Sequence, residues 1–315
     1  MADYKSIKGT KIQNYTTDPD NPLTGQVWYN ETSTTLKVNT GPLVGAWATV
    51  TALNTARNGL KGVGIQTAAL AFAGQIAPGA VGNTESYNGS TWTELNDLNT
   101  ARYNLGSAGT QTAALGFGGI PAPGSALNES WNGTSWTEVN DLNSLRTNVA
   151  GAGTQTAALA IGGNNPAVAL NESWNGTSWT EVNDLNTARG FLAAAGTQPA
   201  ALAFGGNPIT GVTESWNGTS WTEVNDLNTA RNQLAGCGTQ PAALAFGGSI
   251  PPSTAVTESW NGTSWTEVND LNTARQGSAG VGTNTSALAA GGESPRTAAT
   301  EEWTISGGIK TITSS

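Results

Sequence analysis

The sequence predicts an all-β protein in which six copies of a four-stranded unit are arranged radially. Three observations predict this fold: a repeated phrase, a nearly constant spacing between landmark residues, and a composition that disfavours long helices. Among the 315 residues there are 41 Gly and 12 Trp, only 11% are charged, and histidine is absent. Such a composition is typical of tightly turned β-structure.

A Trp-rich phrase recurs along the chain, as NESWNGTSWTEVNDLNTAR at 171–189 and in similar form at 128–146, 213–231 and 257–275. An arginine, a small-residue pair after an Ala-rich strand, and two aromatics each recur six times. Successive arginines are separated by 45, 44, 43, 42 and 44 residues. The recurring arginines are Arg57, Arg102, Arg146, Arg189, Arg231 and Arg275.

Each unit reads R-x4-AGTQxAALAFGG, then a variable stretch, then TESWNGTSWTEVNDLNTA. We expect four short strands, at the AGTQ region, AALAFGG, TESW and TSWTEV, because Gly-Gly and Asn-Gly separate them. Four strands in about 43 residues is the density of a propeller blade. In AALAF, Leu202 and Phe204 face one side and Ala201 and Ala203 the other. The small residues of the first strands are expected to line a narrow channel.

The Asn-Gly pair between the third and fourth strands predicts a two-residue type I′ turn, which makes Trp216 and Trp221 diagonal neighbours. Sheets with one bulky and one small-residue face can nest, so we interpret the tryptophans as filling between sheets. The alternative is a set of sugar-stacking platforms. The tryptophans concerned are Trp47, Trp92, Trp131, Trp136, Trp174, Trp179, Trp216, Trp221, Trp260, Trp265 and Trp303.

The two ends of the chain complement each other. The first landmark is a fourth-strand motif containing Trp47, and the last is a third-strand motif containing Trp303. We expect the N-terminal strand to pair with the last three strands and so close the ring. The predicted domains are an N-terminal β-hairpin and attachment segment at 1–44, a six-bladed β-propeller at 45–305, and a C-terminal tail at 306–315.

These repeats resemble the kelch family. The resemblance rests on the diglycine, an aromatic about a dozen residues later, a Trp five further on and an Arg opening the next unit, over residues 45 to 305. Kelch repeats more often have Tyr at the third-strand aromatic, which here is Tyr only at Tyr87. The resemblance implies a kelch-like six-bladed β-propeller.

A second resemblance lies in GQVWYNETSTTLKVNTG at 25–41, which is similar to a short β-hairpin segment of bacteriophage virion proteins such as tail fibres. This resemblance implies a virion structural or host-recognition protein.

Variable stretches between the second and third strands are the candidate binding loops, because loops on a rigid scaffold are the usual seat of recognition. They are apolar and Pro-rich, which favours contact with a protein surface; the alternative is drift in unconstrained loops. The residues concerned are Ile76, Pro78, Pro121, Pro123, Pro166, Pro208, Ile209, Pro251, Pro252, Pro295 and Arg296.

The recurring arginines could form an anion-binding ring. Pairing with the aspartate five residues earlier, or with a neighbouring blade's glutamate, is the interpretation we favour. In the first copy Ala52 replaces that aspartate, so Arg57 is where an unpaired arginine is expected. Cys237 occupies a small apolar position, and Asp18 belongs to a segment that is typical of a turn.

Three classes of function follow. The first is a non-enzymatic phage virion protein, with other virion proteins or a host surface receptor (protein or glycan) as partners. The second is an intracellular, cytoplasmic kelch-type interaction scaffold. The third is an enzyme that resembles kelch-fold oxidases or sugar mutarotases. It is disfavoured because a copper oxidase needs histidine ligands, which the chain lacks. Acid–base chemistry would fall to carboxylates, Lys or Tyr, and every Glu and Asp of the repeats is duplicated, so none stands out.

We expect no catalytic residues, no metal and no cofactor. The net charge of −9 disfavours nucleic acid, and no apolar run is long enough for membrane insertion. The N-terminal residues lack the apolar core of a secretory signal.

Overall fold

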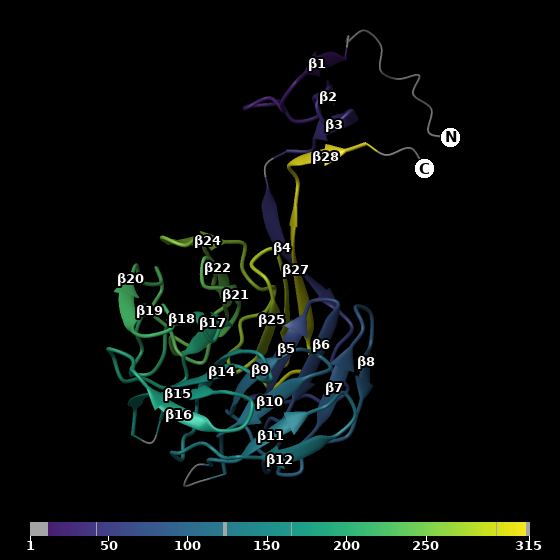
Figure 1. The fold of residues 1–315 in the computed structure, drawn as a ribbon. Coiled ribbons are helices and arrows are strands. Elements are labelled where there is room, and N and C mark those ends of the chain that lie inside the picture. Colours follow the sequence, from purple (N-terminus) through teal and green to yellow (C-terminus); the bar gives the residue numbers. More distant parts are fainter. Residues whose placement is uncertain (1–11, 42, 122–124, 165, 294, 313–315) are drawn as a thin grey trace. The chain divides into compact units, whose positions relative to one another are not determined.

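The computed structural model describes residues 12–41, 43–121, 125–164, 166–293 and 295–312. Within these ranges the chain forms seven four-stranded sheets and no helix, so the all-β prediction is confirmed (Figure 1). No helix of a length and hydropathy that could cross a membrane occurs in the same ranges. The chain divides into two compact units: Met1–Ala46 with Ile305–Ser315 (unit 1), and Trp47–Thr304 (unit 2).

Unit 2 contains six of the sheets formed by the described residues, and each is antiparallel wherever its pairing is resolved. Five are built from consecutive strands. The first two are β5 (Lys61–Ile65), β6 (Ala68–Phe72), β7 (Thr84–Tyr87) and β8 (Trp92–Glu94), then β9 (Gly106–Gly109), β10 (Ala114–Phe117), β11 (Asn128–Trp131) and β12 (Trp136–Val139). The third is β13 (Ala150–Gly153), β14 (Ala158–Gly163), β15 (Val168–Trp174) and β16 (Trp179–Val182). The fourth and fifth are β17 (Ala193–Thr197), β18 (Ala200–Phe204), β19 (Thr213–Trp216) and β20 (Trp221–Val224), then β21 (Ala235–Thr239), β22 (Ala242–Phe246), β23 (Thr257–Trp260) and β24 (Trp265–Val268).

The sixth sheet of unit 2 combines the two ends of the repeat region. Its strand order is β25 (Ala279–Gly282), β26 (Ser286–Ala290), β27 (Thr300–Ser306) and β4 (Val44–Val50). As the sequence predicts, an N-terminal strand completes a sheet begun by the last three strands of the repeats. The neighbouring indoles of Trp47 and Trp303 have ring centroids 5.5 Å apart.

The turn between the third and fourth strands differs from the expected two-residue type I′ turn. Trp216 lies directly opposite Trp221, so the loop contains the four residues 217–220. Asn217 Oδ1 accepts the N–H groups of the two residues after Gly218, each at 2.9 Å, and of the Asn-Gly pair only Gly218 has a positive φ (+91°). The asparagine side chain therefore closes the turn. The two indoles are direct cross-strand neighbours, with centroids 5.3 Å apart, and not diagonal ones.

Neighbouring sheets of unit 2 pack through complementary faces. Leu202 and Phe204 of β18 share a buried cluster with Ala243, Trp260 and Trp265 of the next sheet. The rings of Phe204 and Trp265 have centroids 4.9 Å apart. Burying a large aromatic side chain stabilises the folded chain by on the order of 3 kcal/mol. The cores of unit 2 therefore lie between the sheets.

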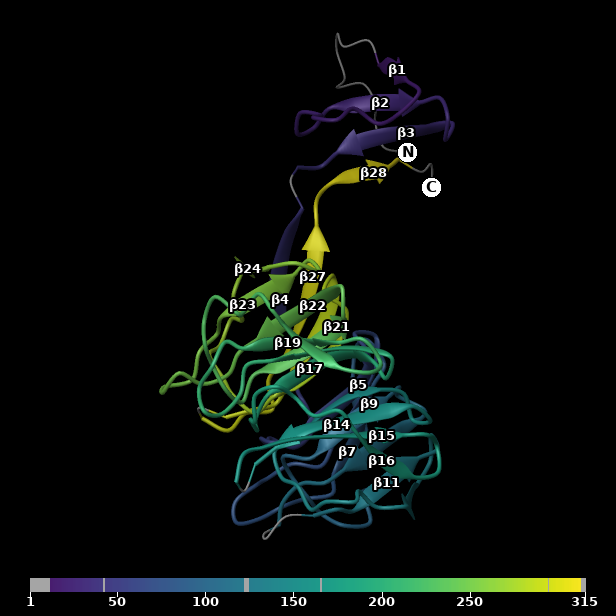
Figure 2. The same cartoon turned by 60° about the vertical axis from the view of Figure 1, so that its left-hand side comes forward.

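The first strands of the six sheets contact one another in the order β5, β9, β13, β17, β21, β25, and β25 in turn contacts β5. Four of these strands, β5, β9, β17 and β21, are labelled in Figure 2. The residue two positions after each recurring arginine takes part in a cycle of six main-chain hydrogen bonds. Each donates its N–H to the equivalent carbonyl oxygen of another sheet, at 2.8–3.1 Å. All six have a positive φ, between +51° and +63°. We call them the hydrogen-bonded ring: Gly59, Asn104, Asn148, Phe191, Gln233 and Gly277.

Unit 1 contains the seventh sheet, with the order β1 (Gln13–Tyr15), β2 (Val27–Asn30), β3 (Thr35–Asn39) and β28 (Ile309–Thr311). Strands β2 and β3 form the hairpin expected from GQVWYNETSTTLKV. Asp18 Oδ1 accepts hydrogen bonds from Asn30 Nδ2 at 2.8 Å and from Trp28 Nε1 at 3.0 Å. These hydrogen bonds hold the pKa of Asp18 below its ordinary value. The turn segment around Asp18 is thus fixed to the hairpin.

The seventh sheet is the main departure from the predicted architecture of six. It arises because β1 runs parallel to β2, and β28 pairs antiparallel with β3. The expected C-terminal tail at 306–315 therefore contains a strand. Its three residues are all exposed and carry no apolar alternation, so its pairing depends on β3 and leaves no pattern in the sequence.

Candidate functional site

Each recurring arginine is buried and ion-paired with a glutamate on the third strand of the sheet that follows it. Arg102 Nη2 lies 2.9 Å from Glu129 Oε1, and Arg146 Nη2 lies 2.8 Å from Glu172 Oε1. Burial lowers the pKa of both guanidinium groups, and the paired glutamate opposes this shift. The other pairs are Arg57–Glu85, Arg189–Glu214, Arg231–Glu258 and Arg275–Glu301. With 0–2% exposure, the six arginines offer no anion-binding ring to solvent.

The aspartate five residues before the arginine, one of the two kinds of partner favoured by sequence reasoning, does not form the arginine's ion pair and has a different partner. Asp226 Oδ1 accepts the N–H of Thr213 at 3.0 Å, and Asp270 Oδ1 accepts that of Thr257 at 3.0 Å. The aspartate thus fixes the start of the third strand. Arg57, expected to be unpaired because its unit lacks this aspartate, pairs with Glu85 like the others.

The tryptophans of the repeats are inaccessible. All eleven named in the sequence analysis are 0–7% exposed. Third-strand indoles donate to a main-chain oxygen, as Trp216 Nε1 does to the carbonyl of Gln198 at 2.9 Å. No face of these indoles is open for stacking on a sugar.

The candidate binding loops lie at the same end of the strands as the hydrogen-bonded ring. In each repeat, the residue before the ring residue forms a β-bridge with the residue that follows the small-residue pair after the second strand, as Gly190 does with Asn207. Ile76 is half-buried and Pro123 lies outside the described residues. The exposed members are Pro78, Pro121, Pro166, Pro208, Ile209, Pro251, Pro252, Pro295 and Arg296.

Two exposed apolar side chains at this end were missed by sequence reasoning. Leu145 is 61% exposed and Ile250 is 40% exposed, comparable with Ile209 at 42%. The sequence does distinguish Leu145: its repeat reads LNSLR, whereas the other five read LNTAR with alanine at this position. These three side chains extend the apolar character of the loops.

A cavity of about 150 Å³ is lined by the first strands of all six sheets. Its lining is mostly Gly and Ala, in keeping with the narrow channel expected from the sequence. Cys237 is 6% exposed and lines this cavity, and burial raises the pKa of its thiol. A raised pKa keeps the thiol protonated, and a protonated thiol is a weak nucleophile.

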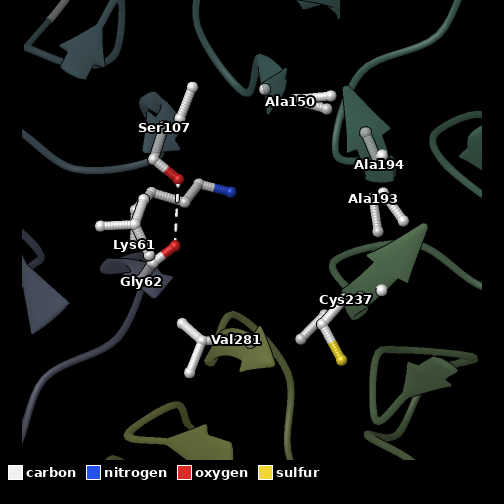
Figure 3. Close-up of a pocket in the computed structure, with 18 of the residues that line it drawn as sticks. Lys61, Gly62, Ser107, Ala150, Ala193, Ala194, Cys237 and Val281 are labelled. Carbon is white, nitrogen blue, oxygen red and sulfur yellow. Dashed lines mark hydrogen bonds between the residues drawn. The ribbon is translucent and has the colours of Figure 1, made fainter. Parts of the chain in front are cut away.

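Lys61 is the only charged side chain among the described residues that line the cavity, and sequence reasoning missed it (Figure 3). Burial lowers the pKa of its amine to about 8. Superposing the repeats would have revealed it, because its column otherwise contains only small residues: Gly106, Ala150, Ala193, Ala235 and Ala279.

Within the described residues, no group of three or more His, Cys, Asp or Glu side chains is placed to hold a metal ion. The sequence matches no model of a known protein family, and comparison with the curated proteins finds no match. The functional proposal therefore rests on the exposed loops, the buried ion pairs and the hairpin of unit 1.

Proposed function

We propose that unit 2 is a kelch-like six-bladed β-propeller and that the chain is a non-enzymatic bacteriophage virion protein. In this proposal unit 1 attaches the chain to the particle, and the loops of unit 2 bind a protein surface on the host or on another virion component. The observation that carries the binding role is the set of exposed apolar loop residues beside the hydrogen-bonded ring.

The propeller proposal is supported by two cyclic features. The first strands contact one another in an order that returns to its start, and the hydrogen-bonded ring contains one residue from just before the first strand of every sheet of unit 2. Full closure of this kind protects sheet edges. A crystal structure of the full chain tests it: six sheets around one channel are expected, and five or seven sheets in the ring would overturn it.

The binding proposal is supported by what the loops expose. Leu145, Ile209 and Ile250 are large apolar side chains that are 40–61% exposed, and a proline adjoins each of the two isoleucines in the sequence. Apolar surface of this kind, held on a rigid scaffold, is typical of protein–protein contact. The buried glutamates are engaged with arginines, which supports a role without acid–base chemistry.

The virion proposal is supported by the VWYN…TLKV hairpin in unit 1, which carries the resemblance to virion proteins. Its test is particle purification. Phages released from the organism that encodes the chain are separated on a density gradient and probed with an antibody against unit 2. The chain is expected to band with the particles. Recovery only from the soluble cell fraction would favour the intracellular scaffold instead.

The loop assignment is tested with matched surface variants of the full chain. Ile209→Asp and Ile250→Asp should abolish binding of the labelled protein to host cells or to purified particles. Ile65→Asp is the control, because Ile65 is 55% exposed but lies at the opposite end of β5 from the hydrogen-bonded ring. Equal binding by all three variants would remove the loops from the proposed interface.

A further inference from the structure

The amine of Lys61 has no protein partner in the cavity of unit 2. Among the residues that the structure describes, none forms an ion pair or a hydrogen bond with it, and burial alone accounts for its lowered pKa. Figure 3 shows its nitrogen directed into the open centre of the cavity, past the hydrogen bond between Ser107 Oγ and the Gly62 carbonyl. A partly buried ammonium without a counter-charge is costly, and a bound anion offsets that cost.

Ser278 supplies an independent polar group at the same place. Its side chain is 8% exposed, and its Oγ has no hydrogen-bond partner among the described residues. Ser278 and Lys61 both line the main cavity and a smaller one of about 30 Å³ that continues from it. A buried hydroxyl without a partner is rare in folded proteins, and a ligand oxygen would satisfy it.

Main-chain groups add to the lining. Each first strand is the terminal strand of its sheet and has a hydrogen-bonded neighbour on one side only. The other edge is free to present N–H and C=O groups to the cavity. The cavity of about 150 Å³ is roughly tenfold larger than the 10–15 Å³ that one water requires. It can hold a small polyatomic ion together with water.

The smaller cavity leads from the hydrogen-bonded ring toward Lys61. Asn104, Asn148, Phe191 and Gln233 place side chains around it, whereas the other two ring members are the glycines Gly59 and Gly277. These two glycines are neighbours in the ring, since the N–H of Gly59 donates to the carbonyl of Gly277 at 2.8 Å. They also precede Lys61 and Ser278 in sequence. The ring is therefore least obstructed beside these two groups.

We infer that this cavity is a binding site for one small oxyanion, such as inorganic phosphate, with Lys61 Nζ as the counter-charge and Ser278 Oγ as a hydrogen-bond donor. A lysine ammonium acts as a point charge that suits a tetrahedral oxyanion without a guanidinium fork. The site is independent of the proposed virion role, because it uses none of the loop residues.

The test is isothermal titration of the full chain at pH 7 with inorganic phosphate, and with chloride at equal ionic strength as the anion control. One phosphate per chain is expected. Lys61→Met should weaken binding by more than about tenfold, and Ser278→Ala by roughly fivefold to tenfold. Lys310→Met is the matched control, since Lys310 is exposed in unit 1, and its affinity should equal that of the parent protein.

A second measurement requires no variant. The pKa of Lys61 is followed by NMR of reductively ¹³C-methylated protein, and it should rise from about 8 when phosphate is added, because a bound anion favours the ammonium. Undiminished phosphate binding by Lys61→Met would overturn the assignment. So would a Lys61 pKa that does not respond to phosphate in the parent protein.

Discussion

The indole Nε1 of Trp136 donates a hydrogen bond to the hydroxyl of Thr84 in the preceding sheet, with 3.0 Å between the two atoms. This contact links the fourth strand of one sheet to the third strand of the preceding sheet, which carries small polar residues. The equivalent pairs are Trp47–Thr257, Trp92–Thr300 and Trp265–Thr213.

Two sheets have an asparagine at the position of this threonine: Asn128, which corresponds to Trp179, and Asn171, which corresponds to Trp221. The indole N–H groups of both tryptophans are buried without a hydrogen-bond partner in the described part of the chain. We predict that Asn171→Thr stabilises the protein by about 1 kcal/mol, because the N–H of Trp221 gains an acceptor. Urea unfolding measures the change. The converse substitution Thr213→Asn should lower stability by a similar amount, and two unchanged midpoints would contradict the interpretation.

The buried ion pairs predict that removing one partner lowers the free energy of unfolding much more than replacing both partners with apolar residues. Glu214→Ala leaves the guanidinium of Arg189 buried and uncompensated, and should lower the free energy of unfolding by about 3–5 kcal/mol. The double variant Arg189→Met/Glu214→Leu should recover most of that loss. Glu223→Ala is the control: Glu223 lies opposite Glu214 across the strands but is exposed, so its change should stay within about 0.5 kcal/mol.

Lys61 predicts a pH dependence of stability. Its pKa is lowered from 10.5 to about 8 on folding, so between these values the unfolded chain binds more protons and stability rises with pH. Because the side chain remains partly accessible, we expect the rise to be roughly 1–3 kcal/mol. It is measured as the difference from Lys61→Met, in denaturant titrations from pH 7 to about 11.

The comparison with Lys61→Met is needed because Cys237 lines the same cavity. Its thiol pKa is raised on folding, so its contribution to stability is lost as pH rises above the ordinary value, opposite in sign to that of Lys61. This contribution is common to both proteins and cancels in the difference. A parallel pH dependence in both proteins would show that the Lys61 amine does not change its protonation on folding as described.

The hydrogen-bonded ring predicts opposite effects at two equivalent positions. Phe191 and Asn148 both have a left-handed conformation, with φ of +53° and +56°, which asparagine tolerates better than a bulky aromatic. Phe191→Asn should therefore stabilise the protein by about 1 kcal/mol, and Asn148→Phe should destabilise it by at least as much. Thermal unfolding measures both, and a gain from Asn148→Phe would be inconsistent with conformational strain at these positions.

The repeat architecture was predictable because the landmarks report directly on periodicity: an arginine, a small-residue pair and two aromatics recur in register, and each has a structural role in every sheet. The turn was mispredicted because Asn-Gly serves both two- and four-residue loops, and only the pairing of Trp216 with Trp221 distinguishes them. Lys61 was missed because the consensus of the six repeats has a small residue at this position, so the one repeat with a lysine does not appear in it. The strand β28 escaped because its pairing is with residues about 270 positions away and leaves no local pattern.

The sheet formed by β25, β26, β27 and β4 sets a condition on synthesis. Residues 44–50 are synthesised before the other repeat strands, and their pairing partner at 300–306 is made only after the strands of five complete sheets. The earliest repeat strand must wait unpaired while five complete sheets form behind it, and a prematurely terminated chain can never satisfy it. Formation of this one sheet thus distinguishes a chain that includes residues 300–306 from any product that stops before them.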